Sequence, residues 1–99
     1  MHAYTQESQL DAFLKLEDYY HAIKEREPNN APVHCACAEL FSRICCRQSS
    51  AIGLCQGLLE HAIRLDGLNA KYYCELGHVF VLNGQYQSAI KMFKESSKK

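Results

Sequence analysis

The chain has 99 residues, of which 47% are hydrophobic and 22% charged, and it contains five Gly and two Pro. This length allows one domain with a folded core, and the low Gly and Pro content argues against a loop-rich or disordered chain. Eleven basic residues balance eleven acidic ones, so no global charge would draw the protein to nucleic acid or to an acidic membrane.

The sequence carries no signal for export or membrane insertion. Its start, MHAYTQESQ, has neither the basic flank nor the apolar core of a signal peptide. No run approaches the ~18 apolar residues of a membrane span. The six cysteines are irregularly spaced on segments that read as helices. We therefore expect free thiols in a reducing, cytoplasmic compartment.

The first expected helix runs from Glu7 to about Arg26, after a flexible N-terminus at residues 1–6. Apolar side chains recur at helical spacing along one of its sides, and the opposite side is charged. This apolar stripe consists of Leu10, Phe13, Leu14, Leu16, Tyr20 and Ile23. Because no helix precedes it to pack on, we expect part of the stripe to stay open and to favour self-association as a homodimer.

Residues 31–69 are expected to form two helices. Asn30 can cap the first, and Pro32 is tolerated in its first turn. Its buried side is expected to hold Val33, Cys37, Leu40, Phe41 and Ile44. After a turn at 47–50, the second helix runs from Ala51 to Leu65. It is expected to bury Ile52, Cys55, Leu58, Leu59, Ala62 and Ile63.

Residues 70–97 are expected to form a further helix pair. Tyr73, Leu76, Gly77 and Phe80 share one face of the first helix, and Tyr86, Ala89, Ile90 and Phe93 share one face of the second. Between them, Gly84 can take the positive φ that ends a helix. Gly77 and Ala89 are small enough for the helices to approach closely, and the aromatic rings would fill the space around that contact.

The order Tyr73-x-x-Leu76-Gly77-x-x-Phe80, then Ala89-x-x-x-Phe93, resembles the tetratricopeptide repeat, or TPR. The resemblance implies an all-α fold, namely the antiparallel helix-turn-helix repeats of a right-handed α-solenoid, in about two and a half units. In this interpretation, residues 7–30 hold the second helix of a truncated unit, 31–69 a divergent unit, 70–97 a well-matched unit and 98–99 a tail.

The middle unit departs from the TPR pattern in length. Its cap Asn30 and the equivalent Asn69 are 39 residues apart, whereas the TPR period is about 34. Cys55 takes the place of the small residue Ala89, and Leu59 and Ala62 complete the packing residues of this unit.

Five short motifs support a narrower resemblance. Phe41-Ser42-Arg43, Leu58-Leu59-Glu60 followed by Ala62, Glu75-Leu76-Gly77, Leu82-x-Gly84 and Ala89-x-Lys91 occur in this order. From about Leu10 to Lys94 they resemble an internal stretch of the large TPR subunit of intraflagellar transport complex A, a ciliary retrograde-transport adaptor. The resemblance implies a fragment of a non-enzymatic scaffold at the cilium or flagellum or its base. It also implies protein partners, namely neighbouring TPR units, transport-complex subunits or cargo.

Zinc binding is one alternative function. Zinc could be held by Cys35, Cys37, Cys45 and Cys46 with His34, but each close pair points to different faces of one helix. We therefore expect no metal and no other cofactor.

Catalysis would need a nucleophile, a base and an orienting group within reach of one another. The histidines His21, His34, His61 and His78 fall on four different expected helices, with no diagnostic spacing. A Cys–His pair could still meet in space, but the pattern favours a protein that is not an enzyme.

A co-chaperone-type module would clamp a peptide carboxylate with Lys, Arg and Asn. Here Lys71 is followed by Cys74, Glu75 and His78, and Glu75 would repel a carboxylate. A generic TPR adaptor, or a peptide-binding module without a carboxylate clamp, remains the alternative to the ciliary scaffold.

Overall fold

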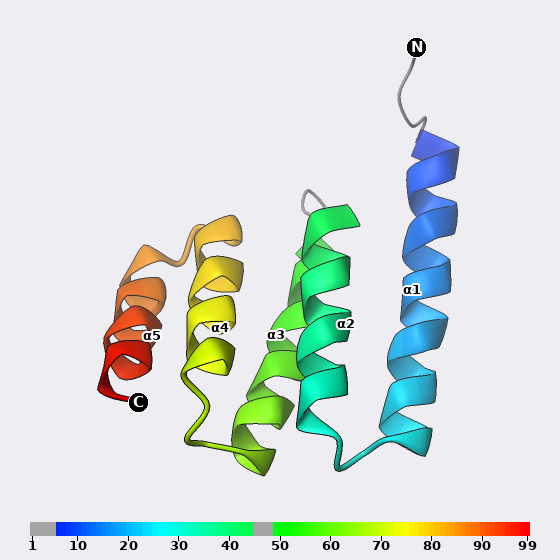
Figure 1. Ribbon diagram of the computed structural model, residues 1–99. Helices are drawn as coiled ribbons and strands as arrows, with labels where there is room; N and C mark the ends of the chain where they lie inside the picture. Colours follow the sequence, from blue (N-terminus) through cyan, green and yellow to red (C-terminus); the bar gives the residue numbers. More distant parts are fainter. Residues whose placement is uncertain (1–5, 45–48) are drawn as a thin grey trace.

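The computed structural model describes the backbone of residues 6–44 and 49–99, and the side chains of residues 14–43 and 50–99. In this part the chain forms α1 (Gln6–Arg26), α2 (Ala31–Ile44), α3 (Ser49–Leu65), α4 (Ala70–Leu82) and α5 (Tyr86–Lys98). The helices follow one another across the molecule, each antiparallel to the one before it (Figure 1). The predicted all-α class of antiparallel helix pairs is confirmed.

Asparagine side chains cap α2 and α4, which open the middle and last helix pairs. The Oδ1 atom of Asn30 accepts the Val33 amide at 3.2 Å, and Oδ1 of Asn69 accepts the Lys71 amide at 3.0 Å. Each bond satisfies one of the amides that a helix start leaves without an intrahelical partner. The two caps therefore mark equivalent points in the chain.

The turn between α4 and α5 depends on Gly84, whose φ is +74°. The amide of Gln85 donates to the Phe80 carbonyl at 2.8 Å, and the amide of Gly84 donates to the Val81 carbonyl at 3.0 Å. This pair of bonds is the Schellman arrangement, which ends a helix with a residue in the left-handed region. Gly84 thus turns the chain sharply enough for α5 to fold back on α4.

The core lies where α2, α3 and α4 meet. Its largest fully buried side chains are Phe41, Leu58, Leu59, His34 and Cys55. The helix α2 contacts both α3 and α4, whereas α1 contacts only α2 and α3, and α5 packs on α4. The helices in the middle of the stack therefore cover one another, whereas α1 and α5 lie at its two ends. Among the described helices, none combines the length and apolar character needed to cross a bilayer.

Candidate functional site

The predicted packing residues of the last helix pair meet between α4 and α5. Leu76 is 3% exposed, Phe80 9% and Ala89 2%, and Gly77 faces the ring of Phe93. Tyr73 is half-buried, and its hydroxyl donates to the Gly67 carbonyl at 2.9 Å. Tyr73 therefore fixes the loop before α4 as well as filling space.

The matching residues of the middle pair lie in the core. Cys55, Leu59 and Ala62 are at most 1% exposed. The Cys55 thiol donates to the Ala38 carbonyl at 3.4 Å, a contact between α3 and α2 that a bulkier side chain would separate. The polar end of Cys55 is thus satisfied without water.

Two residues of the predicted last-unit face lie outside the core. Tyr86 is 62% exposed and Ile90 49%, although both share a helical side with Ala89 and Phe93. In the described part of the chain no helix follows α5 to cover them. Tyr86, predicted as a packing residue, is therefore a surface side chain here.

The apolar stripe predicted on the first helix divides between core and surface. Leu16 is 5% exposed, Tyr20 and Ile23 pack against the core, and Leu14 is 49% exposed. Leu10 and Phe13 lie outside the residues whose side chains the structure describes. The most exposed apolar side chain described on α1 is Tyr19, at 62%, and sequence periodicity did not select it.

An apolar groove of about 290 Å³ runs between α1 and α2. It is lined by Tyr19 and Ile23 from α1, and by Val33, Ala36, Cys37, Leu40 and Phe41 from α2. Leu40 was predicted to be buried, but it is 48% exposed, because no described helix covers this side of α2. Ile44, the last residue of that predicted set, has no described side chain. We call this feature the α1–α2 groove.

The structure contains an internal counterpart of this groove in which the same positions are covered. Counted from the equivalent caps Asn30 and Asn69, Leu40 of α2 corresponds to Val79 of α4, and Cys37 corresponds to Leu76. Val79 is only 3% exposed, because α4 packs against both α2 and α3. The α1–α2 groove is therefore a helix-packing surface without its helix in the described chain.

Two histidines, predicted on separate helices, form a pair between α2 and α3. The rings of His34 and His61 are 4.6 Å apart between centroids. The Nδ1–H of His34 donates to the Asn30 carbonyl at 2.7 Å, and the Nε2–H of His61 donates to the Pro28 carbonyl at 2.7 Å. Both therefore anchor the α1–α2 connection. His34 is wholly buried, with Nε2 unbonded.

The other candidate catalytic and metal residues that the structure describes are not brought together. His21 and His78 are exposed, and His78 packs its ring against Phe93 at 5.4 Å. No group of three His, Cys, Asp or Glu among the described residues could hold a metal ion. Cys45 and Cys46 lie outside them.

Among the described cysteines, Cys35, Cys37 and Cys74 are free thiols. Burial raises the pKa of Cys37 to about 11. Burial, with a further contribution from the charge of Glu39, raises the pKa of Cys35 to about 11. At neutral pH both stay protonated, and a protonated thiol is a poor nucleophile and metal ligand.

Lys71, the cation that a carboxylate clamp would use, is already paired. The Lys71 ammonium lies 3.4 Å from the Glu39 carboxylate of α2. The charge of Glu39, together with its hydrogen bond, raises the pKa of Lys71. A peptide carboxylate would have to share this ammonium with Glu39. The ion pair instead joins α2 to α4.

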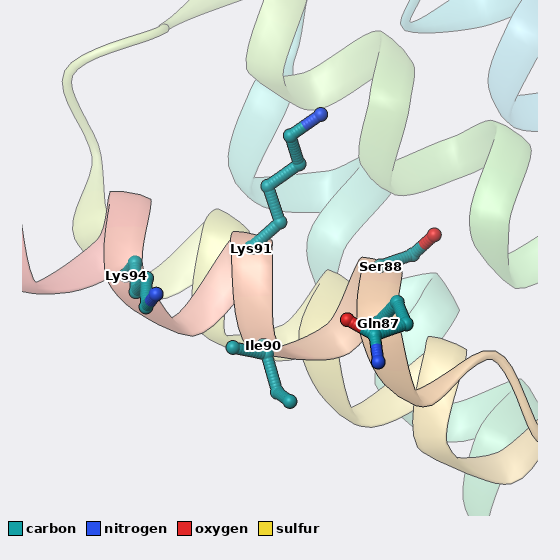
Figure 2. A pocket seen from close by; sticks show the side chains of 5 residues that line it. All are labelled: Gln87, Ser88, Ile90, Lys91 and Lys94. Atoms are coloured by element: carbon teal, nitrogen blue, oxygen red, sulfur yellow. The ribbon is translucent and has the colours of Figure 1, made fainter.

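A second hollow, of about 390 Å³, lies on α5 alone and is lined by Gln87, Ser88, Ile90, Lys91 and Lys94. Figure 2 shows Lys91 and Ile90 pointing to opposite sides of the helix. These side chains do not converge on a common point, so this hollow offers no organised site for a small ligand.

Similarity to known proteins covers most of the chain. A family model described as "Tetratricopeptide repeat protein 21 second ARM domain" matches residues 14–99. Tetratricopeptide repeat protein 21B of Mus musculus is 32% identical over 83 residues, which are 84% of this chain. Tetratricopeptide repeat protein 21A of Mus musculus is 31% identical over 77 residues, which are 78% of this chain. The chain spans 6% of the length of each of these curated relatives. No solved structure matches it.

Proposed function

The chain belongs to the tetratricopeptide repeat protein 21 family, and we propose that it is a non-enzymatic scaffold that binds other proteins through stacked helices. The observation that carries this proposal is the α1–α2 groove. Val79, in the covered counterpart, is 3% exposed, whereas Leu40 is 48% exposed. A surface suited to packing a helix, and not covered by any described residue, fits a protein whose function is assembly.

Within that role, we propose that the chain serves ciliary intraflagellar transport, in complex A and its retrograde movement. The motif resemblance noted in the sequence and the membership of the family support this narrower function. Its partners would be neighbouring TPR units, transport-complex subunits or cargo. It would act in the cytoplasm, at the cilium or flagellum or its base.

The competing proposal is a generic TPR adaptor or a co-chaperone-type module that binds peptides without a carboxylate clamp. The Lys71–Glu39 ion pair disfavours the clamp. The ion pair does not disfavour the binding of a peptide through apolar contacts. The two proposals differ in which proteins would be retained, and this difference can be measured.

The test is quantitative co-purification of the tagged chain from ciliated cells, with two matched variants. Leu40→Glu places a charge in the α1–α2 groove, and Ile90→Glu makes the same change on α5. The side chains of Leu40 and Ile90 are almost equally exposed, at 48% and 49% respectively. We expect complex A subunits to be enriched with the parent chain and with Ile90→Glu, and to be lost with Leu40→Glu. Enrichment of chaperones without complex A subunits would support the competing proposal and overturn the ciliary one.

A further inference from the structure

The internal repeat shows which kind of partner the α1–α2 groove fits. In the covered counterpart, α2 lies against α3 and α4. It runs antiparallel to α3 (Figure 1), and its Glu39 contacts Lys71 at 3.4 Å. By equivalence, the occupant of the α1–α2 groove is a helix that runs antiparallel to α1 and parallel to α2.

We propose that this occupant is α1 of a second copy of the chain, in a dimer with two-fold symmetry. A two-fold axis perpendicular to α1 reverses the direction of the helix. The second α1 therefore enters the groove antiparallel to the first, which is the direction that the repeat requires. By symmetry the first α1 fills the groove of the second copy, so one contact covers both open surfaces. The inference rests on the proposed scaffold function and names the direct occupant of its groove; Leu40→Glu would then lose complex A subunits by dissociating the dimer.

The exposed flank of α1 is suited to pairing with itself. Tyr19 lines the α1–α2 groove and also a neighbouring hollow of about 410 Å³ formed by Lys15, Asp18 and Ala22. In an antiparallel pair, the register that places Leu14 opposite Tyr19 of the second copy also places Lys15 opposite Asp18. The two most exposed apolar side chains described on α1 would then be covered together, with opposite charges beside them.

The size of the contact is adequate for a specific, reversible dimer. The helix α1 has 21 residues, which corresponds to a length of about 30 Å. With helices about 10 Å wide, coverage of α1 and of the facing side of α2 in both copies buries an area on the order of 1,000 Å². Specific interfaces begin near this size.

The test is sedimentation velocity of the full chain with reductant, from about 5 to about 200 µM, a range that brackets micromolar affinity. We expect a monomer–dimer equilibrium. Tyr19→Glu and Leu40→Glu should each raise the dissociation constant at least about tenfold. The matched control Ile90→Glu, on α5, should leave the constant unchanged, and circular dichroism should show that all three variants stay folded.

Charge reversal in two separate chains tests the antiparallel register. Asp18→Lys and Lys15→Asp should each weaken the dimer by placing like charges opposite each other, and an equimolar mixture of the two variants should restore it, because only a pair between chains then joins opposite charges. A photo-crosslinker at position 19 should join the second copy through α1 or α2.

A monomer at the highest concentration would overturn the dimer, as would crosslinks to α5 or dissociation by Ile90→Glu. If such a monomer still retained complex A subunits, the scaffold function would stand without self-association. If the dimer formed but no complex A subunit were retained, the ciliary function would fail alone.

Discussion

The ring of Phe93 lies directly against the backbone of Gly77, so that a Cβ atom at Gly77 would be 2.5 Å from Cε1 of Phe93. Three atoms of the ring lie within 3.0 Å of that position. Real Cβ atoms essentially never approach other atoms so closely. The ring of Phe93 therefore requires a glycine at position 77. Ala89, which lies on the same helix as Phe93, is buried as well.

Gly77→Ala should destabilise the protein, even though Ala is the better helix former. The helix preference contributes about 1 kcal/mol in favour of Ala. Displacement of Phe93 costs about 1–3 kcal/mol, so we expect a net loss of up to about 2 kcal/mol. Chemical denaturation followed by circular dichroism measures this loss.

Gly53→Ala provides the matched control. Gly53 lies within α3, and a Cβ atom there would meet nothing within 4 Å. The change should raise the free energy of unfolding by up to about 1 kcal/mol. In a Phe93→Ala background, Gly77→Ala should lose most of its penalty. If both glycine variants changed stability equally, the close contact with Phe93 would not be the reason for Gly77.

Asn69→Ala should remove the cap of α4 and lower the free energy of unfolding by about 0.5–2 kcal/mol. The lost bond is the one that Oδ1 of Asn69 accepts from the Lys71 amide. Asn69→Asp keeps an acceptor oxygen at this helix start and should retain most of the stability. Thermal melts of the two variants compare them directly. An equal loss in both would show that the acceptor oxygen is not what Asn69 contributes.

Periodicity and small-residue positions predicted the helices, the two Asn caps and a close approach of the last helix pair at Gly77. The predicted neighbour of Gly77 was Ala89, whereas its nearest atoms belong to the ring of Phe93. These features depend on residues close in sequence, or on a pair of helices joined by a short turn. Gly84 is an example, because the turn needs a positive φ at this position, which few residues other than glycine adopt. Local chemistry was sufficient for these parts of the fold.

Which apolar faces are covered could not be read from the sequence. Periodicity shows that Leu40 and Tyr86 share a side with buried neighbours, but burial also needs a helix on that side. The role of Tyr19 was not predicted, because the groove that it lines lies between two helices. Val33 and Leu40, which also line this groove, belong to α2. The His34–His61 contact likewise depends on how α3 returns beside α2.

Stability should fall as the pH rises from about 9 to about 11. The pKa of Cys35 and of Cys37 rises from the ordinary 9.0 to about 11 in the folded chain. Within this window the unfolded chain loses both thiol protons while the folded chain keeps them, so deprotonation favours unfolding. Below pH 9 both states are protonated, and the contribution is fully present.

Urea denaturation at several pH values, with a non-thiol reductant, measures this dependence. The double variant Cys35→Ala, Cys37→Ala removes both groups and should show a shallower fall across the same window. The variant retains every other ionisable group of the parent chain, so the difference between the two slopes isolates the two thiols. Identical slopes for the variant and the parent chain would contradict the assignment to these two thiols.

Alkylation should distinguish the thiols by burial. Cys74 is partly exposed, whereas Cys35, Cys37 and Cys55 are buried. At neutral pH the raised pKa of Cys35 and of Cys37 keeps the thiolate scarce, and reaction also requires local opening of the helices. We expect iodoacetamide to modify Cys74 at least about tenfold faster than the three buried thiols.

Peptide mass spectrometry over a time course measures the rate at each cysteine, and the peptides of Cys45 and Cys46 are quantified separately. In concentrated urea the rates should converge, because unfolding removes the protection. Modification of Cys35 in the folded chain as fast as Cys74 would mean that the α2–α4 contact opens readily, against the packing described above.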